Sequence, residues 1–118
     1  MSHAHHSIDY IELGAPDLQA TKRFYERVFE WKFNDYGPAY AGIQSRDGLR
    51  EVGGLDAGTT PSSGGPLVLL YSSDLDATLA AVTSAGGEIT NGPYVFPGGR
   101  RAHFRDVAGN ELGVWSEA

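Results

Sequence analysis

The stretch Asp17-Leu18-Gln19-Ala20-Thr21 returns later in the chain as Asp74-Leu75-Asp76-Ala77-Thr78. Each copy follows an apolar run typical of a β-strand, residues 8–13 before the first copy and residues 67–72 before the second. A short match alone arises easily by chance, but here the surroundings repeat as well. The pattern therefore predicts two copies of one structural unit.

Each repeated Asp is predicted to begin an amphipathic helix, because its carboxylate can accept hydrogen bonds from the free amides of the first turn. Pro16 favours a break between the preceding strand and the first helix. Gly86-Gly87 is expected to end the second helix as a left-handed cap. Apolar residues recur at three-to-four spacing in both helices, namely Leu18, Thr21, Phe24, Tyr25 and Val28, and then Leu75, Leu79, Val82 and Ala85.

Three strand-like segments follow each predicted helix. They are residues 31–36, 40–44 and 49–55 in the first unit, and residues 88–91, 100–105 and 111–115 in the second. Glycine and proline between residues 92 and 99 predict a long loop, and residues 107–110 predict a tight turn. The chain is thus expected to form one domain, with a flexible segment 1–7, module one 8–55, a mobile linker 56–65 and module two 66–118.

Composition limits the class of protein further. With 41% hydrophobic and 20% charged residues in 118, the chain is expected to fold around a core. Its formal net charge of −6 and lack of a basic stripe argue against nucleic-acid and membrane partners. Cysteine is absent, which excludes disulfides and thiolate sites and fits a cytoplasmic location. His3, His5 and His6 lie in the flexible segment, so they are left out of the predicted site.

Three segments resemble the glyoxalase and bleomycin-resistance proteins of the vicinal-oxygen-chelate superfamily: residues 14–18, residues 23–31 and residues 103–112. The resemblance implies an α+β fold in which two βαβββ modules form a half-open eight-stranded cavity. It also implies a homodimer, because family members often complete their sites by pairing. The family includes isomerases, ring-cleaving dioxygenases, epimerases and drug-sequestering proteins, so the fold alone leaves the activity open.

Enzymes of this family usually hold a divalent metal through His, Glu or Gln side chains on strands one, four, five and eight. The matching positions here are Tyr10 on strand one, Leu67 on strand five and Gly113 on strand eight. On strand four the matching region is Val52-Gly53-Gly54, which places no acid securely. No metal cofactor is therefore expected at the family's usual positions.

A shifted metal site is an alternative, because side chains on a strand alternate between its two faces. If Tyr10 faces the cavity, Glu12 does too, and Glu111 shares a face with Gly113. Glu12, His103 and Glu111 would then supply one imidazole and two carboxylates, which suit several divalent ions. The structural alternative is that both glutamates pair with Arg101 or Arg105 and help to hold the sheet or the dimer.

The predicted site places His103 and Glu12 in catalytic roles. The resemblance implies that His103 lies where related ring-cleaving dioxygenases carry a functional Tyr, and histidine as a residue type suits proton transfer because its unperturbed titration lies nearest neutral pH. The predicted substrate-binding residues are Tyr10, Glu111, Trp115, Arg101, Arg105 and Phe96. The aromatic residues among them, with Tyr36 and Tyr40, either line a pocket or belong to the core.

These features predict a glyoxalase-like protein that binds a small organic molecule, carbonyl-bearing or aromatic. Lyase or isomerase activity of the glyoxalase I type stays open. The main alternative is a metal-free protein that binds or sequesters a small molecule, as bleomycin-resistance proteins do. A third interpretation is a regulatory module whose cavity has lost its function.

Overall fold

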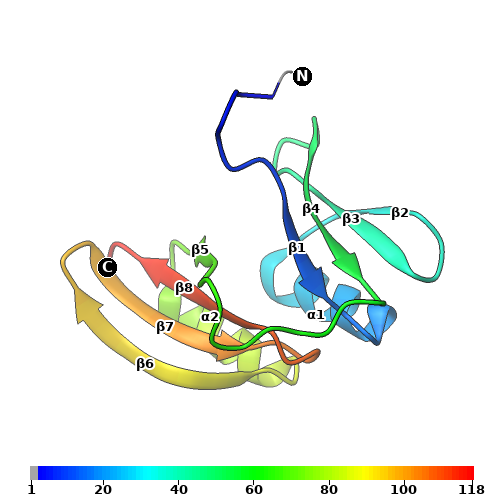
Figure 1. Ribbon diagram of the computed structural model, residues 1–118. Helices are drawn as coiled ribbons and strands as arrows, with labels where there is room; N and C mark the ends of the chain where they lie inside the picture. Colours follow the sequence, from blue (N-terminus) through cyan, green and yellow to red (C-terminus); the bar gives the residue numbers. More distant parts are fainter. Residues whose placement is uncertain (1–2) are drawn as a thin grey trace.

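Two four-stranded sheets and two helices make up the computed structural model, which describes residues 3–118 (Figure 1). The first module contains β1 Ile11–Gly14, α1 Leu18–Phe29, β2 Phe33–Asp35, β3 Tyr40–Gln44 and β4 Glu51–Asp56. The second contains β5 Leu69–Tyr71, α2 Leu75–Ser84, β6 Glu88–Phe96, β7 Gly99–Arg105 and β8 Glu111–Ser116. Neither helix is long and apolar enough to cross a membrane.

Both sheets have the same topology, which confirms the predicted α+β fold of two βαβββ modules. The strand orders are β1-β4-β3-β2 and β5-β8-β7-β6, and in each sheet the first strand of the module runs parallel to the last. The eight strands therefore form two walls of four strands each.

The predicted helix starts are confirmed. Asp17 accepts a hydrogen bond from the backbone amide of Ala20 at 3.1 Å, and Asp74 accepts one from Ala77 at 3.1 Å. After α2, Gly86 adopts a φ of +96°, a left-handed conformation that glycine tolerates without strain. Local sequence thus fixes where both helices begin and how the second one ends.

Helix α1 packs against both modules. Leu18 lies in the cluster of the first sheet with Ile43 and Leu55, whereas Phe24 and Tyr25 lie in the cluster of the second sheet and α2. All of these side chains are at most 6% exposed. Burying one large apolar side chain contributes about 2 kcal/mol, so α1 couples the two sheets through several such contacts.

The prediction of a long loop between residues 92 and 99 is wrong. Strand β6 continues to Phe96, where Phe96 is paired with Gly99, and only a short turn remains. The register shifts between Asn91 and Tyr94, so Gly92 and Pro93 lie at an irregularity of the ladder. Proline is tolerated there because β6 is an edge strand. The backbone N–H that proline lacks therefore has no second neighbouring strand to which it would bond.

A buried polar cluster joins the modules at the turn before β8. Asn110 donates to the backbone oxygen of Gly14 at 2.7 Å and accepts from the amide of Ser62 at 3.0 Å. Asp106 accepts the hydroxyl proton of Tyr25 at 2.7 Å. The segment between the modules is therefore anchored at Ser62, and the tight turn predicted at residues 107–110 is confirmed.

Candidate functional site

Each sheet packs one face against the helices and leaves the other face open. On β7 the buried residues Ala102 and Phe104 point to the core, and the residues that alternate with them, Arg101, His103 and Arg105, point to the open face. The predicted site residues lie on these open faces, two on the first sheet and six on the second.

The open face of the second sheet carries a row of aromatic side chains that we call the aromatic wall, made of Tyr71, Tyr94, Phe96 and Trp115. The ring centroids of Trp115 and Tyr71 are 4.9 Å apart, and those of Trp115 and Phe96 are 6.0 Å apart. Arg101 is paired with Trp115 across the ladder, and its guanidinium lies 5.5 Å from the ring centres of both Tyr94 and Phe96. One cation therefore lies close to two rings of the wall.

His103 lies next to this wall between an acid and a phenol. Its Nδ1 is 3.8 Å from Glu111 Oε2, and its Nε2 is 3.0 Å from the hydroxyl of Tyr94. Arg101 Nε donates to the same hydroxyl at 2.6 Å, so Tyr94 links Arg101 to His103. The arrangement can move a proton between these groups.

The open face of the first sheet carries a different set, which we call the tyrosine–glutamate network: Tyr10, Glu12, Tyr36, Tyr40 and Glu51. Glu51 accepts from the hydroxyls of Tyr10 and Tyr36, each at 2.7 Å. The hydroxyls of Tyr10 and Tyr40 are 2.7 Å apart, and Tyr40 donates to Glu12 at 2.9 Å. Glu12 is therefore held by Tyr40 on the first sheet.

These contacts change the titration of the network. Partial burial acts to raise the pKa of Glu51, but hydrogen bonds donated by Tyr36, Asn34 and Tyr10 outweigh it, and the pKa falls below its ordinary value. The pKa of Tyr10 is raised, first by burial and then by its hydrogen bonds to Tyr40 and Glu51. The network therefore keeps Glu51 ionised and Tyr10 neutral near pH 7.

Sequence reasoning missed Glu51 because of a β-bulge. Gly54 faces the open side, so strict alternation would turn Glu51 toward the core. The register between β3 and β4 shifts between Ile43 and Gln44, Val52 packs on the core, and the carboxylate of Glu51 lies on the open face above Gly42. Glycines at positions 42 and 54 are the sequence feature that could have indicated Glu51, since each leaves room for a polar side chain on the open face.

Tyr94 and Tyr71 were missed for other reasons. Tyr94 fell in the segment interpreted as a loop, although Tyr94-Val95-Phe96 alternates as a strand does. Tyr71 was within a predicted strand but was not assigned to the site. Its hydroxyl donates to Glu117 at 2.9 Å, and its side chain is 53% exposed.

The three residues of the shifted metal site do not form one. Glu12 and Glu111 line the same hollow of about 230 Å³ where the two sheets meet, but His103 does not line it and is near Glu111 and not Glu12. Residues 3–118 contain no group of three His, Asp or Glu side chains arranged to hold a metal ion. The structural alternative was also wrong about their partners, since Arg105 pairs with Glu88 at 3.0 Å, and Glu111 accepts from Thr90 at 3.1 Å.

Strands one, five and eight lack suitable donors at the usual metal positions of the family, and β4 supplies the single carboxylate of Glu51. The hydroxyl of Tyr10 is engaged with Tyr40 and Glu51. A side chain added at Gly113 would meet Leu69 at 2.5 Å and Leu67 at 3.5 Å, so apolar atoms fill that position. This set of residues does not fit a divalent metal, which prefers imidazole and carboxylate ligands.

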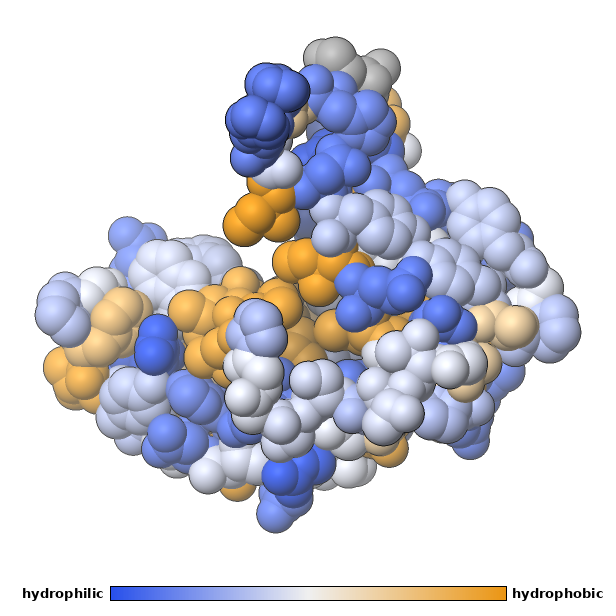
Figure 2. All heavy atoms as spheres, viewed as in Figure 1, coloured by the Kyte–Doolittle hydropathy of each residue, from blue (hydrophilic) through white to orange (hydrophobic). Residues whose placement is uncertain are grey.

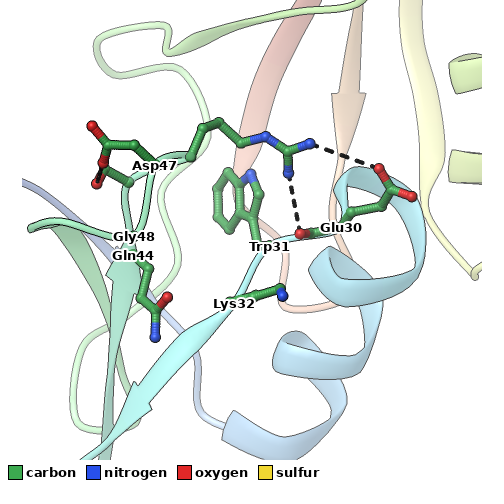
Figure 3. Close-up of a pocket in the computed structure, with 8 residues that line it drawn as sticks. Glu30, Trp31, Lys32, Gln44, Asp47 and Gly48 are labelled. Carbon is green, nitrogen blue, oxygen red and sulfur yellow. Dashed lines mark hydrogen bonds and ion pairs between the residues drawn. The ribbon is translucent and has the colours of Figure 1, made fainter.

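Two further hollows lie beside the end of α1. One of about 220 Å³ is lined by Trp31 and Arg46, and Arg46 donates to the backbone oxygen of Glu30 at 3.2 Å (Figure 3). The other, of about 530 Å³, lies between α1 and the end of β5. Arg46 caps a helix C-terminus, where a cation is stabilising, so a structural role explains it.

Comparisons with known proteins agree with this architecture. A family model of the Glyoxalase/Bleomycin resistance protein/Dioxygenase superfamily matches residues 7–114. An uncharacterized protein from Mycolicibacterium smegmatis is 30% identical over 112 residues, covering 94% of both chains. The chain therefore belongs to the glyoxalase, bleomycin-resistance and dioxygenase superfamily.

Two solved structures share the fold at low identity. A glyoxalase/bleomycin resistance protein/dioxygenase family enzyme from Burkholderia phytofirmans superposes with a TM-score of 0.76 at 17% identity, covering 95% of this chain and 99% of that one. An antibiotic-binding protein from Streptomyces superposes with a TM-score of 0.69 at 23% identity, covering 98% and 100%. These similarities concern the fold.

Proposed function

We propose that this protein binds a small organic molecule, through an aromatic ring, on the open face of the second sheet. The observation that carries the proposal is the aromatic wall, to which strands β5, β6 and β8 each contribute. The apolar core lies on the opposite face, so these rings are not needed to fill it. Aromatic rings in offset or edge-on contact with a planar ligand each add binding free energy.

In the first version of this proposal, the protein binds its ligand without converting it to a product. The Streptomyces protein of the same fold is an antibiotic-binding protein, which supports it. The residues at the family's metal positions support it further, because Tyr10, Leu67 and Gly113 leave the carboxylate of Glu51 as a single suitable ligand, and Tyr10 and Tyr36 already donate to that carboxylate.

Thermal unfolding with and without the neutral planar probe 2-naphthamide tests this proposal. At ten times its Kd, a ligand that binds only the folded chain stabilises it by about 1.4 kcal/mol, or roughly 5 °C in Tm. The variant Trp115→Leu should lose this shift, and Val95→Ala should keep it, because Val95 lies between Tyr94 and Phe96 in sequence and is 79% exposed. NMR shifts that map away from the aromatic wall would contradict the proposal.

A lyase or isomerase activity is the second candidate, and the contacts of His103 with Glu111 and Tyr94 favour it. An imidazole placed between an acid and a phenol suits proton transfer next to a carbonyl. Turnover of a panel of 2-oxoaldehyde adducts tests this candidate. His103→Gln should abolish any such turnover, while binding of 2-naphthamide persists.

A further inference from the structure

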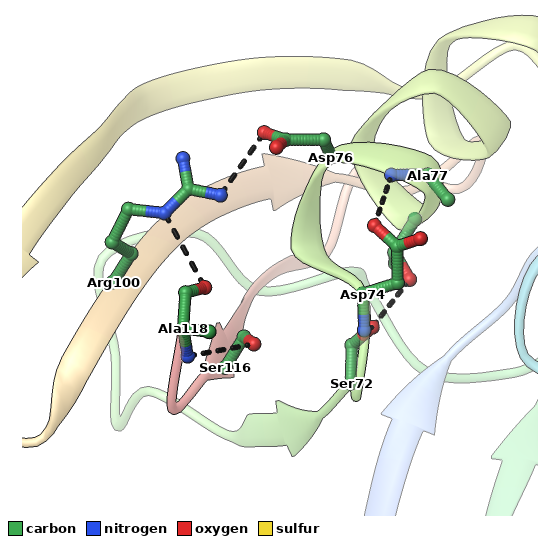
Figure 4. A network of polar contacts seen from close by, with 8 residues as sticks. Ser72, Asp74, Asp76, Ala77, Arg100, Ser116 and Ala118 are labelled. Carbon is green, nitrogen blue, oxygen red and sulfur yellow. Dashed lines mark hydrogen bonds and ion pairs between the residues drawn. The ribbon is translucent and has the colours of Figure 1, made fainter.

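The contacts of Arg101 differ from those of the other two arginines on β7. Arg100 pairs with Asp76 at 3.1 Å and donates to the backbone oxygen of Ala118 at 3.5 Å (Figure 4), and Arg105 pairs with Glu88 at 3.0 Å. Arg101 forms no ion pair with any carboxylate of residues 3–118. Its one hydrogen bond goes from Nε to the hydroxyl of Tyr94 at 2.6 Å. A cation therefore lies on the open face without a protein anion.

The side chain of Arg101 is also held in one orientation. Nε is fixed by Tyr94, and the guanidinium carbon lies 5.5 Å from the ring centres of Tyr94 and Phe96. Because Nε is occupied, the two terminal nitrogens of the guanidinium remain as donors. Two parallel N–H groups match the two oxygens of a carboxylate, and a preorganised fork loses little side-chain entropy on binding.

The surroundings of Arg101 favour an anion with an attached ring. Arg101 is half-buried among aromatic side chains, where the effective dielectric constant is lower than in water and a charge pair is stronger. Trp115 is paired with Arg101 across the ladder, and its ring lies 6.0 Å from that of Phe96. A ligand whose oxyanion meets Arg101 therefore places its adjoining ring against Trp115 and Phe96.

We infer that the aromatic wall selects aromatic carboxylates, with the ligand carboxylate bound by the terminal nitrogens of Arg101 and the ligand ring packed on Trp115 and Phe96. This inference rests on the proposed function and adds the charge of the ligand to it. The opposite open face does not compete for such a ligand, because it presents the carboxylates of Glu12 and Glu51.

Calorimetric titration with 2-naphthoate and with its neutral isostere 2-naphthamide tests the inference. The wild type should bind 2-naphthoate about tenfold more tightly or better, since a hydrogen bond to a charged group outweighs a neutral one by this amount. Arg101→Met should remove that preference and leave binding of 2-naphthamide within about twofold. Arg100→Met is the matched control, because Arg100 is the next residue on β7, and it should keep the preference.

Two further measurements protect the test against a folding defect in Arg101→Met. Arg101→Lys keeps the charge but loses the fork and the contact with Tyr94, so it should retain only part of the preference for 2-naphthoate. In the wild type, the NMR signal of the Arg101 Nε–H should move further with 2-naphthoate than with 2-naphthamide, because the carboxylate bonds to the same guanidinium.

The outcomes separate this inference from the proposed function. If the wild type binds both probes equally, or if Arg101→Met keeps the preference for 2-naphthoate, the carboxylate inference is wrong. The proposed aromatic site is not contradicted by either result. Failure of both probes to bind the wild type overturns both.

Discussion

Removing the hydroxyl of Tyr25 is expected to destabilise the protein by about 2 kcal/mol, the range for a hydrogen bond to a charged group. Tyr25 is fully buried, Asp106 is 4% exposed, and the hydroxyl donates to Asp106 Oδ2 at 2.7 Å. Phe keeps the ring, which stacks on Trp31 with centroids 4.3 Å apart. Asp106 still accepts from Asn110 at 3.1 Å, so Tyr25→Phe removes a single bond.

Urea unfolding of Tyr25→Phe measures this loss, which corresponds to a midpoint lower by about 1 M at the usual slope for a small domain. Tyr71→Phe is the matched control, because it removes a hydroxyl from an exposed pair and should change stability by about 0.5 kcal/mol or less. A loss in Tyr25→Phe no larger than in Tyr71→Phe would refute the reasoning.

The same variant predicts a pH dependence. Burial, then the charge of Asp106 and its hydrogen bond, raise the pKa of Tyr25 well above its ordinary value of 10.0. The unfolded chain therefore loses this proton first, and the stability that Tyr25 contributes is complete below pH 10 and falls as the pH rises further. The difference in the free energy of unfolding between the wild type and Tyr25→Phe should therefore decrease above pH 10.

Four other predictions concern the open faces and the assembly. The pKa of Glu51 lies below its ordinary value of 4.5, because hydrogen bonds from Tyr36, Asn34 and Tyr10 outweigh the opposing effect of burial, so the stability it contributes is present above pH 4.5 and lost as the pH falls further. Urea unfolding at pH 6 and pH 3.5 should show a smaller acid loss in Glu51→Gln than in wild type. Gly54→Ala should cost about 1 to 3 kcal/mol in the same assay, because the added methyl collides with the hydroxyl of Tyr40. Light scattering should give twice the chain mass of 12.6 kDa, since Ile11 and Leu69 remain exposed on the edge strands β1 and β5. Figure 2 shows apolar side chains gathered on the face between the two sheets, and a monomer at micromolar concentration would contradict this expectation. Elemental analysis of a variant lacking residues 1–7 should find less than one divalent metal per chain, because Tyr10, Leu67 and Gly113 replace the family's ligands.

The sequence by itself determined the features that depend on neighbouring residues. Asp17 and Asp74 begin helices because a cap acts within one turn, and the repeat around them predicted two equivalent modules. Alternation along β7 placed Arg101, His103 and Arg105 on one face, because that pattern is a property of a single strand.

Tertiary structure decided which of these side chains meet. The bulge opposite Gln44 turned Glu51 to the open face, and the register shift in β6 brought Tyr94 to Arg101 and His103. Neither shift can be derived from one strand, because pairing between strands sets it. The contact of Asn110 with Gly14 likewise joins residues 96 positions apart. Local chemistry therefore fixed the elements, while strand register and long-range packing built the candidate site.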